Sequence, residues 1–303
     1  MALPPHATTF EKTWHVAYLV FCGLVFFFLI APIIVIIPLS FNHEPYFTFT
    51  RAMLHFDPAG YSLRWYDKIF TLGMTAPGAD RGAAWWADAW ANSQWINAAK
   101  NSFIIGIAST LVATTLGTLA ALGLSRPEMP ARRLIMALMI SPMIVPMIIS
   151  ATGLFFFYSE VHLAHTYAGI ILAHAMLGIP FVVITVTATL VGFDRSLTRA
   201  AASLGAPPFT TFRQVILPLI LPGVISGALF AFVTSFDEVV VVLFIASYDQ
   251  HTIPLQMWDG IREQISPTIL AVATILILFS ISLLTTLELL RRRSERLRGL
   301  RPE

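Results

Sequence analysis

The 303-residue chain is 56% hydrophobic and only 12% charged, and its mean hydropathy is +0.74. Soluble domains carry about 25% charged residues, so this composition excludes an ordinary soluble enzyme and indicates an integral membrane protein. The formal net charge of +2 is too small to indicate a nucleic-acid partner.

Six windows of at least 23 residues contain no Asp, Glu, Lys or Arg. Each window can hold the roughly 20 apolar residues that a helix needs to cross the hydrocarbon layer. Because a helix satisfies its own backbone hydrogen bonds in lipid, the pattern predicts an all-α protein with six transmembrane spans. These windows are 13–43, 101–125, 134–159, 161–193, 214–236 and 264–287.

The distribution of basic residues predicts that both termini are cytoplasmic. With that orientation, 13 lysines and arginines fall inside and 6 fall outside, as the positive-inside rule requires. The first span is longer than a signal-peptide core and no small-residue cleavage site follows it, so it is expected to be retained. The predicted division is a cytoplasmic N-terminus at 1–15, a first span at 16–41, a periplasmic loop at 42–97, a five-span core at 98–290 and a basic cytoplasmic tail at 291–303.

The predicted outer loop and the basic tail both point to the membrane surface. AAWWADAWANSQW at 83–95 is rich in tryptophan, a residue that favours the membrane interface, so an interfacial helix is predicted there. Contact with a partner protein is the alternative that the sequence leaves open. RRRSERLRGLR in the tail is interpreted as a topology signal that meets anionic lipid headgroups.

Two further features are expected to be structural. In the third window, ISPMIVPMI contains Ser141, Pro142 and Pro146, which are predicted to break or bend the helix and either to open a cavity or to improve packing. His162 and His165 have no third ligand nearby in the sequence, so no metal site is predicted.

The stretch TRAAASLGAPPFTTFRQVILPLILP lies between the fourth and fifth windows. Asp194 or Ser196 can cap a short helix over 195–204, and Gly205 is suited to end it in the left-handed conformation. Such a helix is about 15 Å long, too short to cross a membrane. Two interpretations remain open: a partner protein binds it on the cytoplasmic side, or it is an interfacial helix without a partner.

This stretch resembles the cytoplasmic loop of the permease subunits of type I binding-protein-dependent ABC importers. The loop pattern of that family is Glu-Ala-Ala, three residues, Gly, nine residues, Ile, any residue, Leu-Pro. AHAMLGIPFVVITVTATLVGFD at 173–194 and TSFDEVVVVLFIASYDQHTIPLQMWDG further on are similar to the spermidine/putrescine-type branch, as are SLRWYDKIF and NSFIIGIASTLVATTLGTLAALGLSR. In this chain the loop pattern falls on Arg199, Ala200, Ala201, Gly205, Val215, Leu217 and Pro218.

The resemblance implies a non-catalytic permease subunit of the bacterial inner membrane. A separate ATPase homodimer would bind ATP and Mg and engage the short helix, and a periplasmic solute-binding protein would deliver a small, cationic, polyamine-like solute. A second permease, expected to be a different chain, would supply the other half of the pathway. The acidic first residue of the family motif is replaced here by Arg199. The residues expected to couple to the ATPase are Arg199, Ala200, Ala201, Ser203, Leu204, Gly205, Pro207 and Pro218.

The chain itself provides no ATP site. It has three lysines, and none completes the glycine-rich loop that cradles phosphates. No cofactor is therefore expected on this chain.

The candidate pathway residues are Asp237, Glu238, Phe236 and His174. The two adjacent carboxylates interrupt an apolar run, so they either line the pathway and attract a cation or sit at the aqueous boundary and cap a helix. His174 either contacts solute or is satisfied by a backbone carbonyl, the commoner outcome for a lone histidine in a packed bundle.

A secondary transporter and an intramembrane protease are the rival functions for such an apolar chain. A secondary transporter usually shows inverted repeats, and no convincing similarity relates residues 1–150 to 151–303. An intramembrane serine protease is a remote alternative, in which Ser125 of Gly123-Leu124-Ser125 would be the nucleophile and His174 its base.

Overall fold

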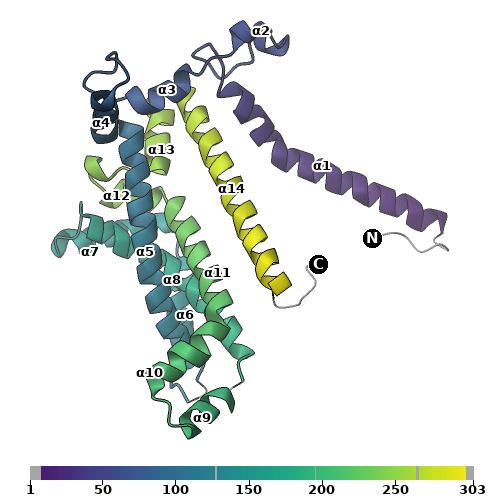
Figure 1. The fold of residues 1–303 in the computed structure, drawn as a ribbon, viewed down its shortest axis with the longest axis vertical. Coiled ribbons are helices and arrows are strands. Elements are labelled where there is room, and N and C mark those ends of the chain that lie inside the picture. Colours follow the sequence, from purple (N-terminus) through teal and green to yellow (C-terminus); the bar gives the residue numbers. More distant parts are fainter. Residues whose placement is uncertain (1–7, 127, 195, 264–265, 298–303) are drawn as a thin grey trace. The chain divides into compact units, whose positions relative to one another are not determined.

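The computed structural model describes residues 8–126, 128–194, 196–263 and 266–297. Within these ranges the chain is helical and forms no β-strand, apart from an isolated bridge between Asn42 and Tyr61. The chain divides into two compact units, one made of residues 1–72 and 260–303 and the other of residues 73–259. Figure 1 shows the helices of both units.

The first unit begins with the long apolar helix α1 (Thr9–Leu39). Thr8 and Glu11 form a capping box at its start, in which the Thr8 backbone N–H donates to the Glu11 carboxylate at 2.7 Å. Because this cap satisfies the free amide groups of the first turn, the helix starts before the predicted span at 16–41 and includes the charged residues Glu11 and Lys12. Residues 1–7 of the predicted N-terminal segment lie outside the described residues.

The segment after α1 is organised by Asn42, whose side chain is fully buried. Its side-chain amide donates to the carbonyl groups of Tyr46 and Thr48, both at 2.8 Å, and its backbone carbonyl accepts the indole N–H of Trp65 at 2.7 Å. These bonds hold an irregular chain in place. The short elements of this segment are α2 (Arg51–Leu54), η1 (Pro58–Gly60) and α3 (Arg64–Thr71).

Helix α14 (Thr268–Leu297) completes the first unit and packs against α3 and α1. Its apolar part is Thr268–Ser282. The helix continues into the predicted basic tail as far as Leu297, and residues 298–303 lie outside the described residues.

The second unit is built around three long helices, α5 (Gln94–Leu124), α8 (Tyr167–Val191) and α11 (Leu217–Phe236), which pack on one another. Small residues let these helices approach closely. A Cβ added at Gly117 of α5 would lie 2.7 Å from Cβ of Val182 on α8, and one at Gly178 of α8 would lie 2.9 Å from Cβ of Ala231 on α11.

Shorter elements surround this core. Helix α13 (Ile253–Glu263) begins in this unit, and its residues from Gly260 onward belong to the first unit. The shorter elements are α4 (Ala83–Asn92), α6 (Arg132–Ile140), η2 (Ser141–Met143), α7 (Met147–Glu160), α9 (Ser196–Ser203), α10 (Pro208–Thr211), the π-helical turn η3 (Phe212–Ile216), α12 (Val240–Ile245), η4 (Tyr248–Gln250) and α13 (Ile253–Glu263).

Among the described residues, four helices are long and apolar enough to cross a membrane: Thr9–Leu39, Gln94–Leu124, Tyr167–Val191 and Pro208–Phe236. The predicted third span is broken, because Arg132–Met143 and Met147–Glu160 meet at 98°. The break lies at Ser141, Pro142 and Pro146, as the sequence predicted, and counting the bent pair as one span gives five. The sixth predicted span corresponds to α14, whose described apolar part has fewer than 18 residues.

Candidate functional site

The predicted short helix between the fourth and fifth windows is α9. The Asp194 carboxylate caps it by accepting the backbone N–H of Ser196 at 2.8 Å. Hydrogen bonds from Ser196, through its side chain and its backbone, hold the pKa of Asp194 below its usual value. Of the two capping residues that the sequence offered, Asp194 therefore takes the role.

The C-terminal end of α9 is closed by Gly205, which has φ of +80°. Its N–H donates to the Ala202 carbonyl at 2.9 Å, and the N–H of Ala206 donates to the Ala201 carbonyl at 3.0 Å. This bond pair is the Schellman closure that a left-handed glycine allows. The predicted end at residue 204 is thus confirmed within one residue, and Pro207 and Pro208 follow as the start of α10.

The surface of α9 and the turn after it is largely exposed. Leu204 is 88% exposed and Phe209 is 73% exposed. Leu204 is among the residues predicted from the sequence, whereas Phe209 is not. Arg199, Ala200, Ser203 and Gly205 are also exposed, whereas Ala201 is half-buried.

Behind α9 lies a cavity of about 680 Å³. It is bounded by the last turns of α5 and α8 on one side and by α9 and α10 on the other, so α9 is not packed tightly onto the core. The lining includes Leu122, Arg126, Phe193, Thr198, Ala202 and Phe212.

The connection from α10 to α11 passes through the π-helical turn η3. A proline lacks a backbone N–H, and its ring crowds the carbonyl four residues earlier. For Pro218 that carbonyl belongs to Gln214, which lies within η3. The wider π turn accommodates the proline without ending the helix, so Pro218 marks an irregular joint at the start of α11.

His174 lies inside the three-helix core and is 1% exposed. Its Nδ1 is 2.7 Å from Oγ of Ser235 on α11, and Oγ of Ser109 on α5 donates to the same Ser235 oxygen at 2.9 Å. Of the two alternatives for this histidine, the backbone carbonyl is not the partner of Nδ1, which meets a hydroxyl group instead, and contact with solute stays a prediction. The cluster of His174, Ser235 and Ser109 links α8, α11 and α5.

The protease alternative is contradicted by this geometry. Ser125 is near the end of α5, and its hydroxyl donates to the Leu122 carbonyl at 2.9 Å. His174 meets α5 instead through Ser109 and Ser235, and Ser109 precedes Ser125 by 16 positions along the chain, or about 24 Å along a helix. The two side chains therefore cannot act as nucleophile and base.

The remaining candidate pathway residues lie where α11 ends. The Phe236 ring is 5.4 Å from the Phe232 ring and 5.4 Å from the Phe103 ring on α5. Asp237 is exposed, whereas Glu238 is 8% exposed and accepts the backbone N–H of Val241 at 2.7 Å. Glu238 thus bonds an amide in the first turn of α12, and Asp237 is the exposed carboxylate of the pair.

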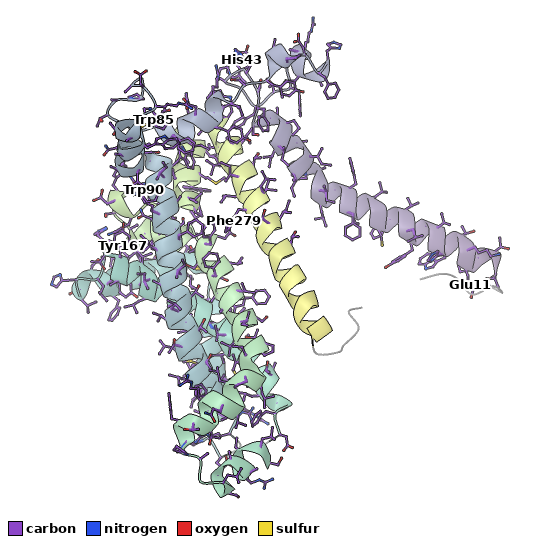
Figure 2. The ribbon with its side chains drawn as sticks, in the orientation of Figure 1. Glu11, His43, Trp85, Trp90, Tyr167 and Phe279 are labelled. Carbon is purple, nitrogen blue, oxygen red and sulfur yellow. The ribbon has the colours of Figure 1, made fainter. Side chains whose placement is uncertain are left out.

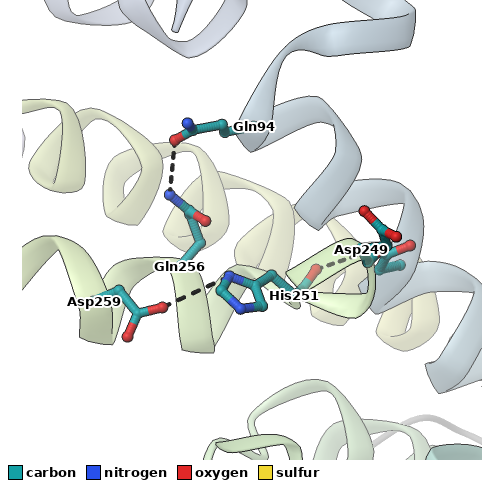
Figure 3. A network of polar contacts seen from close by, with 6 residues as sticks. Gln94, Asp249, His251, Gln256 and Asp259 are labelled. Carbon is teal, nitrogen blue, oxygen red and sulfur yellow. Dashed lines mark hydrogen bonds and ion pairs between the residues drawn. The ribbon is translucent and has the colours of Figure 1, made fainter. Parts of the chain in front are cut away.

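Hydrogen bonds centred on Asn101, near the start of α5, form a network that is called here the polar latch. The sequence did not indicate it. The Asn101 amide donates to the carbonyls of Asp249 and His251 at 2.8 and 2.9 Å, and its own carbonyl accepts the hydroxyl of Tyr167 at 2.7 Å. Gln250 donates to the His165 carbonyl at 2.8 Å. These partners are about 65 to 150 positions apart in the sequence, so no local pattern could indicate them. Figure 3 shows neighbouring contacts, in which Gln256 bonds Gln94 and His251 pairs with Asp259.

The tryptophan-rich segment forms α4, which Ser93 separates from α5. Trp85 is buried, whereas Trp86 and Trp90 are more than half exposed. Figure 2 labels Trp85 and Trp90 in this part of the chain. Lys100 donates to the Trp90 carbonyl at 2.7 Å and lies 4.9 Å from the Trp90 ring. Exposed indole rings beside a lysine suit a membrane interface, and the predicted helix is present.

The fold and the loop geometry together describe a polytopic membrane protein that presents a short capped helix outside its helical core. The family model for the inner membrane component of binding-protein-dependent transport systems matches residues 113–297. The chain belongs to this family, as a permease of an ABC importer, and is a multi-pass protein of the inner membrane.

Two relatives match over most of the chain. The spermidine/putrescine transport system permease protein PotC of Haemophilus influenzae is 29% identical over 274 residues, which are 90% of this chain and 96% of that protein. The putrescine transport system permease protein PotI of Escherichia coli K12 is 29% identical over 276 residues, with 88% and 86% covered. A probable molybdenum ABC transporter permease of Haloferax volcanii is 33% identical over 175 residues, 55% of this chain and 65% of that protein.

A solved structure with the same fold is that of a bacterial ABC transporter involved in the import of the acidic polysaccharide alginate. It matches with a TM-score of 0.68 at 15% identity and covers 94% of this chain and 99% of that chain. Proteins named for polyamines, for molybdenum and for a polysaccharide are all similar to this chain in sequence or in fold, so similarity alone does not select a solute.

Proposed function

We propose that this chain forms half of the translocation pathway of an ATP-driven importer and is driven by a separate ATPase that engages α9. The supporting observation is the geometry of α9: an eight-residue helix capped at both ends, with Arg199, Ala200, Ser203 and Leu204 exposed. The closed ends make α9 a rigid body, and the irregular joint before Pro218 connects it to a long core helix. A rigid helix can transmit the closure of a partner to the spans.

The proposal includes six spans with both termini in the cytoplasm. The basic residues at the ends of the predicted spans support this orientation. The bent pair α6–η2–α7 supplies the third span, and α14 supplies the sixth. A second permease, a different chain, completes the pathway, and a periplasmic binding protein delivers the solute.

ATP and Mg are bound by the partner ATPase, an expected homodimer. Where the family motif begins with an acidic residue, Arg199 offers a cation, so the partner groove is proposed to present acidic or hydrogen-bond-accepting groups to it. The exposed apolar residues Leu204 and Phe209 supply the hydrophobic part of the docking surface.

The proposed solute is a small polyamine-like cation. The relatives named for spermidine and putrescine match about nine-tenths of the chain, whereas the relative named for molybdenum matches 55%. The exposed Asp237 at the end of α11 offers the anionic group that such a solute needs.

The coupling role is tested by Gly205→Pro in the reconstituted transporter. Proline cannot adopt a φ of +80° and removes the N–H that bonds the Ala202 carbonyl. We expect at least a tenfold loss of ATP-driven uptake with the ATPase still hydrolysing ATP. Gly205→Asn is the matched control, because asparagine tolerates the left-handed region, and it should retain most of the uptake. Normal uptake by the proline variant would contradict the coupling role of α9.

A further inference from the structure

A polar cavity of about 390 Å³ lies at the end of α5 opposite to α9. This volume is within the range of small-molecule sites in proteins. The lining residues come from α4, α5, α8, η4 and α13, so the core holds them in fixed positions. They are Asn92, Gln94, Asn97, Ala98, Lys100, Asn101, Ile104, Tyr167, Tyr248, Asp249, His251 and Gln256.

The walls of this cavity are fixed by the polar latch. Asn101 uses its amide on the carbonyls of Asp249 and His251, so the backbone of the segment over 248–251 is tied to α5. Ser102 adds a bond from the Ile253 N–H at 2.8 Å. A preorganised wall lowers the entropic cost of binding a ligand.

The charges that line the cavity favour a cation. The Asp249 carboxylate is exposed and makes no hydrogen bond or ion pair with the described residues. Lys100 is the one lysine or arginine in the lining, and its ammonium is held at the carbonyl and ring of Trp90. His251 is 3.6 Å from Asp259. A free carboxylate thus faces a site whose one lysine already has partners.

The uncharged part of the lining suits an alkyl amine. Tyr248 is 69% exposed next to Asp249, and aromatic faces attract ammonium groups. The side-chain carbonyls of asparagine and glutamine can accept N–H groups, and Ala98 and Ile104 offer apolar contact for methylene groups. Phe103, the residue before Ile104, has its ring against that of Phe236, the residue before Asp237. Asp237 is therefore a second carboxylate at the same end of the core.

We propose that this cavity is an acceptor site that holds one ammonium group of an alkyl amine against Asp249 and Tyr248, before the solute passes toward Asp237. The proposal rests on the proposed function, because it assigns a site to the amine solute of that transporter. Alkyl diamines and triamines are the class that fits, since they combine separated ammonium groups with methylene chains.

The test is equilibrium binding of radiolabelled spermidine to the intact transporter complex in nanodiscs, without ATP and without the binding protein. Asp249→Asn removes the charge and keeps the shape, and we expect the half-saturating concentration to rise about fivefold, as for a partly exposed ion pair. Lys100→Gln removes the opposing cation and should lower that concentration about twofold. Asp80→Asn, an exposed carboxylate outside the cavity, is the matched control and should leave binding unchanged.

The outcomes separate this inference from the proposed function. If the wild-type transporter takes up spermidine with its binding protein and Asp249→Asn binds it as the wild type does, the acceptor site is refuted and the transporter remains a polyamine importer. If the wild type imports no polyamine in proteoliposomes, the proposed solute fails, and the inference fails with it. Equal losses in Asp249→Asn and Asp80→Asn would show a general surface effect and would also overturn the site.

Discussion

Helices α1 and α8 have similar lengths and apolar compositions but different surroundings. The most apolar window of α1 has a mean hydropathy of 3.1 and no buried residue, whereas that of α8 has 2.2 and is 61% buried. The buried faces of α8 and its neighbours use Gly, Ala, Ser and Thr, and α1 carries mainly large side chains. Because lipid tails are as apolar as leucine, close packing rather than hydrophobicity associates helices in a membrane.

The largest effect is expected when α1 and α5, the partner of α8 in the core, receive the same substitution at a glycine. Gly117→Val on α5 places a Cβ 2.7 Å from that of Val182 on α8, and overpacking of this kind costs about 2 kcal/mol. Gly23→Val on α1 is the matched control, because nothing lies within 4 Å of its added Cβ. Thermal unfolding in detergent measures both, and a similar melting temperature for the two variants would contradict the close packing of α5 on α8.

An intermediate effect is expected from the buried hydroxyl cluster. His174→Ala removes the Nδ1 partner of the buried Ser235 hydroxyl, which keeps its bond from Ser109, at a cost of about 1 kcal/mol. His15→Ala on α1 is the comparison, since that histidine is only half-buried, and surface changes usually stay within about 0.5 kcal/mol. Denaturant titration in mixed micelles measures the free energy of unfolding. An unchanged midpoint for His174→Ala would show that the cluster contributes nothing to the core.

The smallest effect is expected at the exposed end of the second unit, where Asp88 holds the turn before α4. Hydrogen bonds from the Asn92 side chain and then the Ala76 backbone lower its pKa from 3.8 to about 2. Because the folded pKa is depressed, the stabilisation is present above pH 3.8 and is lost as the pH falls toward 2.

This prediction is measured as local amide exchange in the segment over 75–92 at pH 5 and pH 3. Asp88→Asn should remove the dependence on pH over that interval, whereas Asp80→Asn, whose carboxylate lies outside these bonds, should keep it. Equal pH dependence in the wild type and Asp88→Asn would assign the effect to another group.

The contrast between α1 and α8 also shows which features of the fold can be predicted from the sequence. Runs without charge predicted every long helix, because the cost of placing a charge in hydrocarbon acts at each position separately. The ends differed where a cap decided them, as at Thr8 and Ser93. The left-handed glycine at 205 was predictable because few other residues adopt that conformation.

Side-chain partners were not predictable in the same way. The sequence identified His174 and the adjacent Asp237 and Glu238, but only the packed helices brought Ser235 and Ser109 to the histidine and turned Glu238 toward Val241. The latch at Asn101 joins residues more than 60 positions apart.

The sequence by itself determined that this is an all-α membrane protein, where its long helices lie and where its short capped helix begins and ends, because hydropathy and capping act over a few turns of chain. The tertiary structure alone decided which helices are buried, which hydroxyl meets His174 and which carboxylate is free, because those outcomes depend on distances between segments that are remote in the chain.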